Sequence, residues 1–199
     1  MSQSHSYYAH PTAIVESLAI GEGTTIWHFA HVRHGSRIGK NCNIGKSVYI
    51  DIDAEIGSNV KIQNFVSVYK GVIIEDDVFV GPCATFTNDL YPRAFIWDEE
   101  HVSATRICRG ASIGANATLV CGSTVGQYAM IGAGSVVAKD VPPFALVLGN
   151  PARQKGYVCY CGHRLKDAAT QSNGKTVEGT RQTCSRYGVG FRADSAEQP

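Results

Sequence analysis

The stretch that decides the fold is IGKNCNIGKSVYIDIDAEIGSNVKI, residues 38–62, in which an isoleucine returns at every sixth position. The same period extends outward from Ile14 to Phe86, and after a break it resumes from Ile107 to Val137. A large apolar residue stands at all nineteen of these positions, far more often than chance would place one there. The sequence therefore predicts a repetitive, solenoid-like fold.

The other positions of the repeat explain how such a chain can coil. Four residues after each anchor comes a mostly small or aliphatic residue, which suits a narrow interior. Three residues after the anchor, Gly, Asn or Asp appears in thirteen of nineteen repeats, and these residues tolerate the positive φ of a sharp corner. Three edges then close a triangular coil of about eighteen residues, and coils stack at about 4.8 Å through backbone hydrogen bonds. We expect about six coils.

The period breaks between Phe86 and Ile107, where the chain has about fifteen more residues than the repeat requires. The extra segment mixes hydrogen-bonding side chains with large apolar ones: Asn88, Asp89, Arg93, Tyr91, Phe95 and Trp97. A solenoid accommodates such an excursion as a loop that leaves an edge, and loops of this kind usually carry function. We expect the loop to pack on a neighbour.

Composition favours one compact domain with a tail. The chain has 199 residues, is 44% hydrophobic and has a net charge of +1, so it shows no bias toward nucleic acid or membrane. The first thirteen residues lack the basic and apolar regions of a targeting signal, so we expect a cytoplasmic protein. Of the seven cysteines, Cys42 and Cys121 fall at or near interior positions, which predicts buried thiols rather than a disulfide scaffold.

Several motifs beyond the repeat point to a family. They are WHFAHV (27–32), KIQNFVSVYKGV (61–72), FTNDLYPR (86–93), RGASIGANATLVCGSTVG (109–126), KDVPPFALVLGNPAR (139–153) and CYCG (159–162). Over about residues 8 to 165 the chain resembles the bacterial nucleotide-sugar N-acetyltransferases, which are hexapeptide-repeat acyltransferases. The resemblance implies an all-β, left-handed parallel β-helix with one long extruded loop and a short irregular C-terminal extension. We expect the β-helix to span residues 1–153, with the loop at 87–106 and a partly flexible extension at 154–199.

The same resemblance implies a reaction and an assembly. It favours acetylation of the 3-amino group of UDP-2-acetamido-3-amino-2,3-dideoxyglucuronate, in lipopolysaccharide and O-antigen sugar synthesis, with acetyl-CoA as cosubstrate. The alternative acceptor is a dTDP-linked 3-amino-deoxyhexose. Electron-withdrawing substituents lower the pKa of a sugar amine, so direct attack on the thioester needs positioning more than a strong base. The sites would lie between the subunits of a homotrimer.

Individual roles follow by matching the family's motifs. Asn88 corresponds to a loop asparagine beside the reacting groups, and Asp89 is expected to assist it; the structural alternative for both is an Asx turn. Substrate contacts are expected from His28, Gln63, Asn64, Tyr69 and Arg93. Coenzyme A contacts are expected from Lys139, Asn150 and Arg153, with backbone groups around Ala111 and Ala129 holding the pantetheine.

Two other classes of function compete. His28, His31 and His34 form a cluster in sequence, and the zinc-dependent carbonic anhydrase of the same fold holds its metal by three imidazoles from two subunits. Two ligands of that family are four residues apart, a spacing not found among these three histidines. A purely structural prism would not need the aromatic and polar loop.

The C-terminal cysteines depart from the family pattern. Related chains often end in CxCG followed by CxxCG, a four-cysteine zinc ribbon. This chain keeps Cys159 and Cys161 but then offers only Cys184, with Tyr187 in place of the fourth thiolate, and the spacing of His163 is unusual. We therefore expect no metal requirement, and zinc at Cys159 and Cys161 is the less favoured alternative.

Overall fold

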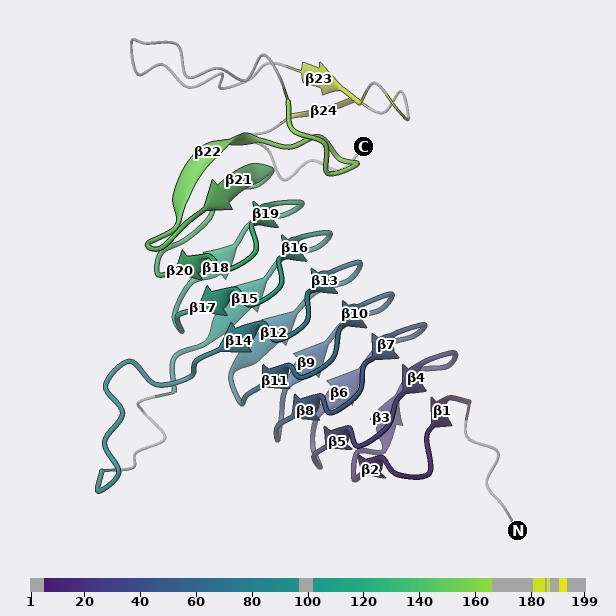
Figure 1. Ribbon diagram of the computed structural model, residues 1–199. Coiled ribbons are helices and arrows are strands. Elements are labelled where there is room, and N and C mark those ends of the chain that lie inside the picture. The colour runs from purple at the N-terminus through teal and green to yellow at the C-terminus, as the bar shows by residue number, and fades with distance from the viewer. Residues whose placement is uncertain (1–5, 97–101, 166–180, 185, 187–189, 193–199) are drawn as a thin grey trace.

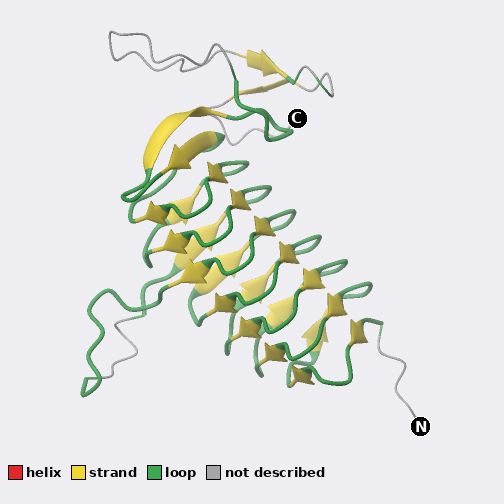
Figure 2. Cartoon of the chain, in the orientation of Figure 1, coloured by secondary structure: helices red, strands yellow, loops and turns green. Residues whose placement is uncertain are grey.

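The chain forms a parallel β-solenoid whose coils stack from the N-terminus toward the C-terminus (Figure 1). The structure is a computed structural model that describes residues 6–96, 102–165, 181–184, 186 and 190–192. The described residues contain strands, turns and loops, as the colouring in Figure 2 shows. Among them there is no helix long and apolar enough to span a membrane.

Three sheets make the sides of the prism, and most strands have only two residues because a corner follows so soon. Sheet A runs through β1 (Tyr8–Ala9), β4 (Thr25–Ile26), β7 (Asn43–Ile44), β10 (Lys61–Ile62), β13 (Phe79–Val80), β16 (Ser112–Ile113), β19 (Met130–Ile131), β21 (Ala145–Leu148) and β22 (Arg153–Tyr157). Sheet B runs through β2 (Ile14–Val15), β5 (His31–Val32), β8 (Tyr49–Ile50), β11 (Ser67–Val68), β14 (Thr85–Phe86), β17 (Thr118–Leu119) and β20 (Val136–Val137). Sheet C runs through β3 (Ala19–Ile20), β6 (Arg37–Ile38), β9 (Glu55–Ile56), β12 (Val72–Ile74), β15 (Thr105–Ile107) and β18 (Thr124–Val125).

The core is a continuous column inside the prism. Anchors such as Ile44, Ile62 and Leu119 are 0% exposed, and the small second residues, such as Ala54 and Ala117, are also 0% exposed. In the parallel ladders each anchor lies directly over the anchor one coil away, as Ile62 does over Ile44. The predicted all-β, left-handed β-helix class and its two interior positions are thus confirmed.

The corners confirm the turn prediction and extend it. The residue three after the anchor has positive φ at every repeat from Gly23 to Cys83 and from Gly110 to Gly134. Bulky residues obey the same geometry, with φ of 58° at Phe29 and 62° at Phe65. Glycine is required for another reason at Gly39, where a Cβ would lie 2.5 Å from the carbonyl carbon of Gly57 on the next coil. Close stacking of coils excludes any side chain there.

Two expectations about the repeat are wrong in detail. Sheet A contains eight parallel strands in the described chain, so the solenoid has about eight levels rather than six. The six-residue period did not predict β1 and β21, because their residues do not continue the series of large apolar anchors. The first anchor is also misplaced, because Val15 and not Ile14 pairs with Val32. Ile14 points outward and is 57% exposed, since the first coil is one residue shorter between Val15 and Ile20.

The last coil is closed by the segment that follows it. Strand β22 returns antiparallel to β21, so the expected boundary after Arg153 lies inside a paired strand. Beyond it, β23 (Arg181–Thr183) and β24 (Gly190–Arg192) form a separate antiparallel pair. The predicted flexible stretch 167–182 lies outside the described residues except for its last two, and Trp97, His101 and Tyr187 also lie outside them.

Candidate active site

The residues expected in the site fall on two different corners of the prism. We call the connection from sheet A to sheet B the A/B corner, and that from sheet B to sheet C the B/C corner. His28, Gln63 and Asn64 follow sheet A strands and lie on the A/B corner, whereas Tyr69, Asn88 and Lys139 follow sheet B strands and lie on the B/C corner. One side of the prism, about five extended residues or roughly 15 Å, separates the two corners.

The long loop leaves from the B/C corner after β14 and returns into β15, projecting from the side of the solenoid (Figure 1). Its stem is closed by an antiparallel bridge between Asp89 and Val102, and the Ser103 amide donates to the Asn88 carbonyl at 3.0 Å. The loop is therefore an ordered excursion at its base, fixed to the corner that carries Asn88.

The two loop residues expected to be catalytic differ in what holds them. One carboxylate oxygen of Asp89 accepts from the Tyr91 amide at 2.7 Å, which is the Asx turn that was the structural alternative. Asn88 is half-buried, and among the described residues no partner is recorded for its side-chain amide. The donor and acceptor groups of Asn88 therefore have no partner within the described part of the chain, whereas Asp89 stabilises the stem of the loop.

The outer part of the loop exposes apolar surface. Tyr91 is 80% exposed and Phe95 is 83% exposed, and within the described residues the Arg93 guanidinium donates to the neighbouring Pro92 carbonyl at 3.3 Å. Exposed apolar patches often mark sites of contact with another surface. The guanidinium of Arg93 remains exposed and able to meet an anion.

The A/B corner carries an aromatic and cationic strip. The ammonium of Lys46 lies 5.9 Å from the ring centroids of both Phe29 and Phe65. The ring of His28 stacks on His10 with centroids 3.5 Å apart, and burial, together with the nearby His28, lowers the pKa of His10. The side-chain oxygen of Asn64 accepts from the Lys46 amide at 2.8 Å, so this residue braces the corner.

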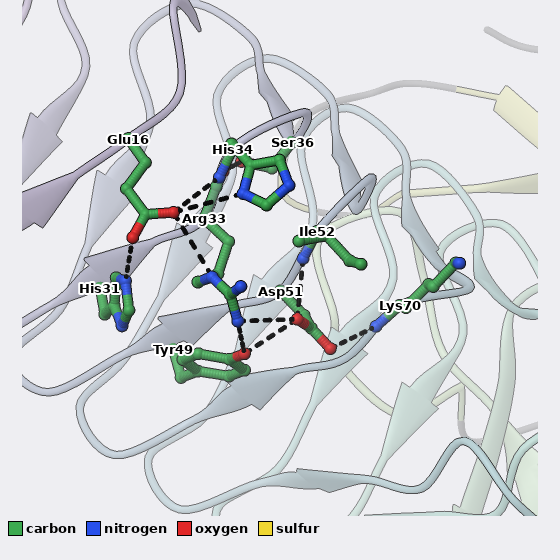
Figure 3. A network of polar contacts seen from close by, with 9 residues as sticks. All are labelled: Glu16, His31, Arg33, His34, Ser36, Tyr49, Asp51, Ile52 and Lys70. Atoms are coloured by element: carbon green, nitrogen blue, oxygen red, sulfur yellow. Dashed lines mark hydrogen bonds and ion pairs between the residues drawn. The ribbon is translucent and has the colours of Figure 1, made fainter. Parts of the chain in front are cut away.

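The B/C corner also holds a polar network that sequence reasoning missed, drawn in Figure 3. The guanidinium of Arg33 donates to the Tyr49 hydroxyl at 3.1 Å and lies 3.4 Å from a carboxylate oxygen of Glu16 and 3.8 Å from one of Asp51. The Tyr49 hydroxyl in turn donates to Asp51 at 2.8 Å. The network orders the surface beside Tyr69, whose ring centroid is 6.0 Å from that of Tyr49.

The contacts within this network shift the pKa values of its members. Hydrogen bonding from His31, and then from the His34 amide, lowers the pKa of Glu16 to about 2. The bond to Tyr49 raises the pKa of Arg33, and burial raises that of Tyr49. The coil length could have predicted this network from the sequence. Arg33, Asp51 and Tyr69 are spaced eighteen residues apart and therefore stack on successive levels.

Higher on the prism, a pocket of about 470 Å³ collects part of the expected coenzyme A site. Lys139 and Arg153 both line it, together with Asp140, Pro151 and other residues of the closing segment. Asn150 is exposed and adjoins the lining residue Pro151. Two exposed cations around one hollow suit a polyphosphate.

Ala111 and Ala129, by contrast, lie inside the solenoid at 0% exposure. Their amides donate to Cys108 and Gly126, and their carbonyls accept from Phe79 and Ser112. Both backbone groups of each alanine are therefore used within the solenoid. Any pantetheine contact in this region falls to exposed neighbours.

The three clustered histidines do not form a metal site within the chain. His28 lies on the A/B corner, His31 lies in sheet B, and His34 lies on the B/C corner. In the part of the chain that the structure describes, the one group of three or more His, Cys, Asp or Glu ligands that converge is Cys159, Cys161 and Cys184. The geometry gives the carbonic anhydrase alternative no support.

The coiled prism, its extruded loop and its cationic pocket define a hexapeptide-repeat transferase. The chain belongs to the family described as bacterial transferase hexapeptide (six repeats), whose model matches residues 19–51, 53–88 and 104–139. It is 48% identical, over 83% of its length and 85% of the relative's, to dTDP-3-amino-3,6-dideoxy-alpha-D-galactopyranose 3-N-acetyltransferase from Aneurinibacillus thermoaerophilus.

Solved structures show the same fold at lower identity. A hexapeptide-repeat acetyltransferase from Vibrio cholerae, complexed with acetyl coenzyme A, is 26% identical, with a TM-score of 0.51 over 62% of this chain and 70% of that chain. The acetyltransferase domain of PglB from Neisseria gonorrhoeae is 25% identical, with a TM-score of 0.50 over 74% of this chain. The match spans only 57% of that second chain.

Proposed function

We propose that this protein is an acetyl-CoA-dependent N-acetyltransferase of a nucleotide-linked amino sugar, and that its acceptor is a dTDP-linked 3-amino-3,6-dideoxyhexose. The observation that carries the proposal is the 48% identity, across most of both chains, to an enzyme named for that chemistry. This substrate is the alternative given by the sequence resemblance. It replaces the UDP-linked uronate as the preferred acceptor, because the relative acts on a dTDP sugar.

The reaction requires the amine nitrogen to attack the thioester carbonyl carbon, after which the carbon–sulfur bond breaks and the amine loses a proton. A sugar amine beside electron-withdrawing groups is partly neutral near pH 7, so the protein's main task is to align the reactants. The side-chain amide of Asn88, which has no partner within the described residues, supplies a donor and an acceptor at the loop stem for this purpose. Lys139 and Arg153 bind the phosphates of coenzyme A in the pocket that they line.

The distribution of residues supports a site shared between subunits. His28, Gln63 and Asn64 cannot meet the same amine as Asn88 within one chain, because a side of the prism separates the two corners. In a closed cyclic trimer, the A/B corner of one subunit can face the B/C corner and loop of the next. The exposed Tyr91 and Phe95 then have a surface to pack on.

The test is acetyl transfer followed by mass spectrometry of the acceptor. The protein is incubated with acetyl-CoA and either dTDP-3-amino-3,6-dideoxygalactose or UDP-2-acetamido-3-amino-2,3-dideoxyglucuronate. We expect one acetyl group on the dTDP sugar, and a loss of about 100-fold or more in kcat for Asn88→Ala. The control is Asn59→Gly, which keeps a left-handed residue on the corner between sheets C and A, away from the site.

Each outcome has a distinct meaning. Acetylation of the UDP sugar alone would overturn the assigned acceptor and retain the enzyme class. If neither sugar gains an acetyl group, the proposed function is wrong. If Asn88→Ala performs like Asn59→Gly, positioning by Asn88 is wrong even when the sugar is correct.

A further inference from the structure

Three cysteine sulfurs converge at the C-terminal end of the solenoid. Cys159, Cys161 and Cys184, here called the cysteine cluster, place their Sγ atoms within 4.8 Å of one another. Two of them follow β22, and the third directly follows β23, more than twenty residues later. Cys159 and Cys184 are buried at 4% and 0% exposure, and Cys161 is partly exposed.

The backbone around the first two cysteines is a tight turn that directs both sulfurs to the same place. The Gly162 amide donates to the Cys159 carbonyl at 2.7 Å, and the Cys159 amide donates to the His163 carbonyl at 2.8 Å. Gly162 has a φ of 83°, which a residue with a side chain rarely adopts.

A candidate fourth ligand, His163, lies next to Cys161. The Nδ1 atom of His163 lies 3.3 Å from the sulfur of Cys161, and the ring is exposed. Tetrahedral zinc with bonds of about 2.3 Å to sulfur and 2.0 Å to nitrogen sets ligand separations of about 3.8 Å between sulfurs and about 3.5 Å between sulfur and nitrogen. The three sulfurs lie within 4.8 Å of one another, and His163 Nδ1 is already close to the required separation from the Cys161 sulfur. The exposed His163 ring would have to turn toward Cys159 and Cys184 to complete the set.

The other cysteines do not share this arrangement. Cys42 fills an interior position at 2% exposure and donates its thiol to the Gly57 carbonyl at 3.1 Å. Cys83 is exposed on the A/B corner, whereas Cys121 is buried on the B/C corner. Packing accounts for a cysteine at an interior position, but it does not account for three that meet at one point from two segments.

We propose that the cysteine cluster binds one Zn²⁺ per chain through Cys159, Cys161 and Cys184, with His163 as the fourth ligand. Thiolate and imidazole ligands in a closed tetrahedral set select zinc and are typical of structural sites. The proposal reverses the expectation from sequence, in which Tyr187 in place of a fourth cysteine argued against a metal. His163 completes the set from within the turn instead.

The metal would fasten the C-terminal hairpin onto the last coil. Cys159 and Cys184 pack with Phe144, and the ring of Phe144 stacks on Tyr128 with centroids 5.2 Å apart. This small second core closes the end of a solenoid whose interior would otherwise meet water. The site is independent of acetyl transfer, so its test does not depend on the proposed acceptor.

The experiment measures zinc in full-length protein purified without a polyhistidine tag. We expect about one zinc per chain by elemental mass spectrometry in the wild type and in Cys83→Ser, the control with an exposed thiol elsewhere. Cys184→Ser and Cys161→Ser should lose at least about 100-fold in zinc affinity, and His163→Ala should lose about tenfold or more. After metal removal, Co²⁺ should give the visible bands of tetrahedral thiolate ligation in the wild type and in Cys83→Ser.

Circular dichroism of each variant separates loss of the site from loss of the fold, because the β-solenoid signal does not depend on the cluster. A content of less than about one zinc ion per ten chains after growth with added zinc, together with the absence of cobalt bands, would overturn the proposal. A thiol titration of the denatured, unreduced protein that finds five free thiols instead of seven would also overturn it, because two cysteines would then form a disulfide. Zinc retained equally by Cys184→Ser and Cys83→Ser would place the metal elsewhere and also contradict it.

Discussion

At the scale of single residues, two threonines occupy equally buried positions but differ in their hydrogen bonds. Thr24 and Thr105 are both 0% exposed. The Thr24 hydroxyl donates to the Gly39 carbonyl at 2.8 Å and accepts from the Cys42 amide at 3.0 Å. The Thr105 hydroxyl has no partner among the described residues. A buried hydroxyl without a partner reduces stability, so Thr105 represents a local cost where the loop returns to the coil.

Replacing each threonine by valine, which has nearly the same shape, should therefore change stability in opposite directions. We expect Thr105→Val to stabilise the protein by about 1 kcal/mol and Thr24→Val to destabilise it by about 1–3 kcal/mol. Denaturant unfolding of the two variants and the wild type, at one protein concentration, measures both changes. A destabilised Thr105→Val would show that this hydroxyl is bonded after all.

Glu16 provides a pH-dependent prediction at the same scale. Its pKa falls from 4.5 to about 2 because His31 and the His34 amide hydrogen-bond the carboxylate in the folded protein. The stabilisation is thus fully present above pH 4.5 and is lost as the pH falls toward 2. Glu16→Gln should lower the melting temperature at pH 6, and the difference from the wild type should shrink steadily between pH 4.5 and pH 2.

Melting curves of the two proteins across that pH range make the measurement. Glu22→Gln, which removes an exposed carboxylate from another corner, controls for net charge. A Glu16→Gln deficit of the same size at pH 2.5 and at pH 6 would show that the carboxylate charge is not what stabilises the wild type.

At the scale of elements, the strands and corners could be predicted from sequence and the functional contacts could not. A six-residue period specifies which side chains face inward, because every coil repeats the same backbone and the same pairing. That backbone prevails over local preference, since Phe29 and Phe65 adopt the left-handed conformation that their corners impose. The role of Asp89 at the stem of the loop could not be predicted in this way. The same sequence is compatible with an Asx turn and with a catalytic carboxylate, and the structure shows the turn.

The loop itself gives the prediction at this scale. The hydrophobic core ends at Phe86 and resumes at Ile107, so the loop contributes little to the buried column. Asp89 and Val102 already face each other as bridge partners, so an Asn-Gly turn can join them in place of residues 90–101. We expect the shortened protein to melt cooperatively with an unchanged β-sheet circular dichroism spectrum and to have no measurable acetyl transfer.

Insertion of two extra glycines into the loop of the full-length protein controls for altered chain length. Near wild-type transfer by the shortened protein would mean that the loop is not part of the site. An unfolded product would mean that the loop has a structural function that its exposed side chains do not show.

On the scale of the whole molecule, the sequence motifs predict candidate site residues but not which of those residues lie close together. Tyr69, Asn88 and Lys139 share one corner because each follows a sheet B strand by one or two residues, and the repeat of the coil brings Asn88 and Lys139, apart from the loop insertion, to equivalent positions. His28, Gln63 and Asn64 lie across a side of the prism, which no sequence motif reveals. The network of Glu16, Arg33 and Tyr49 was also unforeseen, because its members become neighbours only after coiling.

A shared site predicts that two inactive variants complement each other. Asn64→Ala damages only the A/B corner and Asn88→Ala only the B/C corner, so each homotrimer should be defective at all three sites. In randomly mixed trimers, an intact A/B corner faces an intact B/C corner at about one interface in four. Co-expression of the two variants should therefore restore up to about a quarter of the wild-type rate, and mixing without subunit exchange should restore none.

The same design distinguishes the competing arrangement. If both corners of one chain served one site, every chain in the mixture would carry a defect and no combination would be active. Recovery after co-expression, together with a trimer mass by light scattering, would place each site between neighbouring subunits. The absence of recovery, with mixed trimers confirmed, would mean that each active site depends on both corners of a single chain, and it would contradict a site shared between subunits.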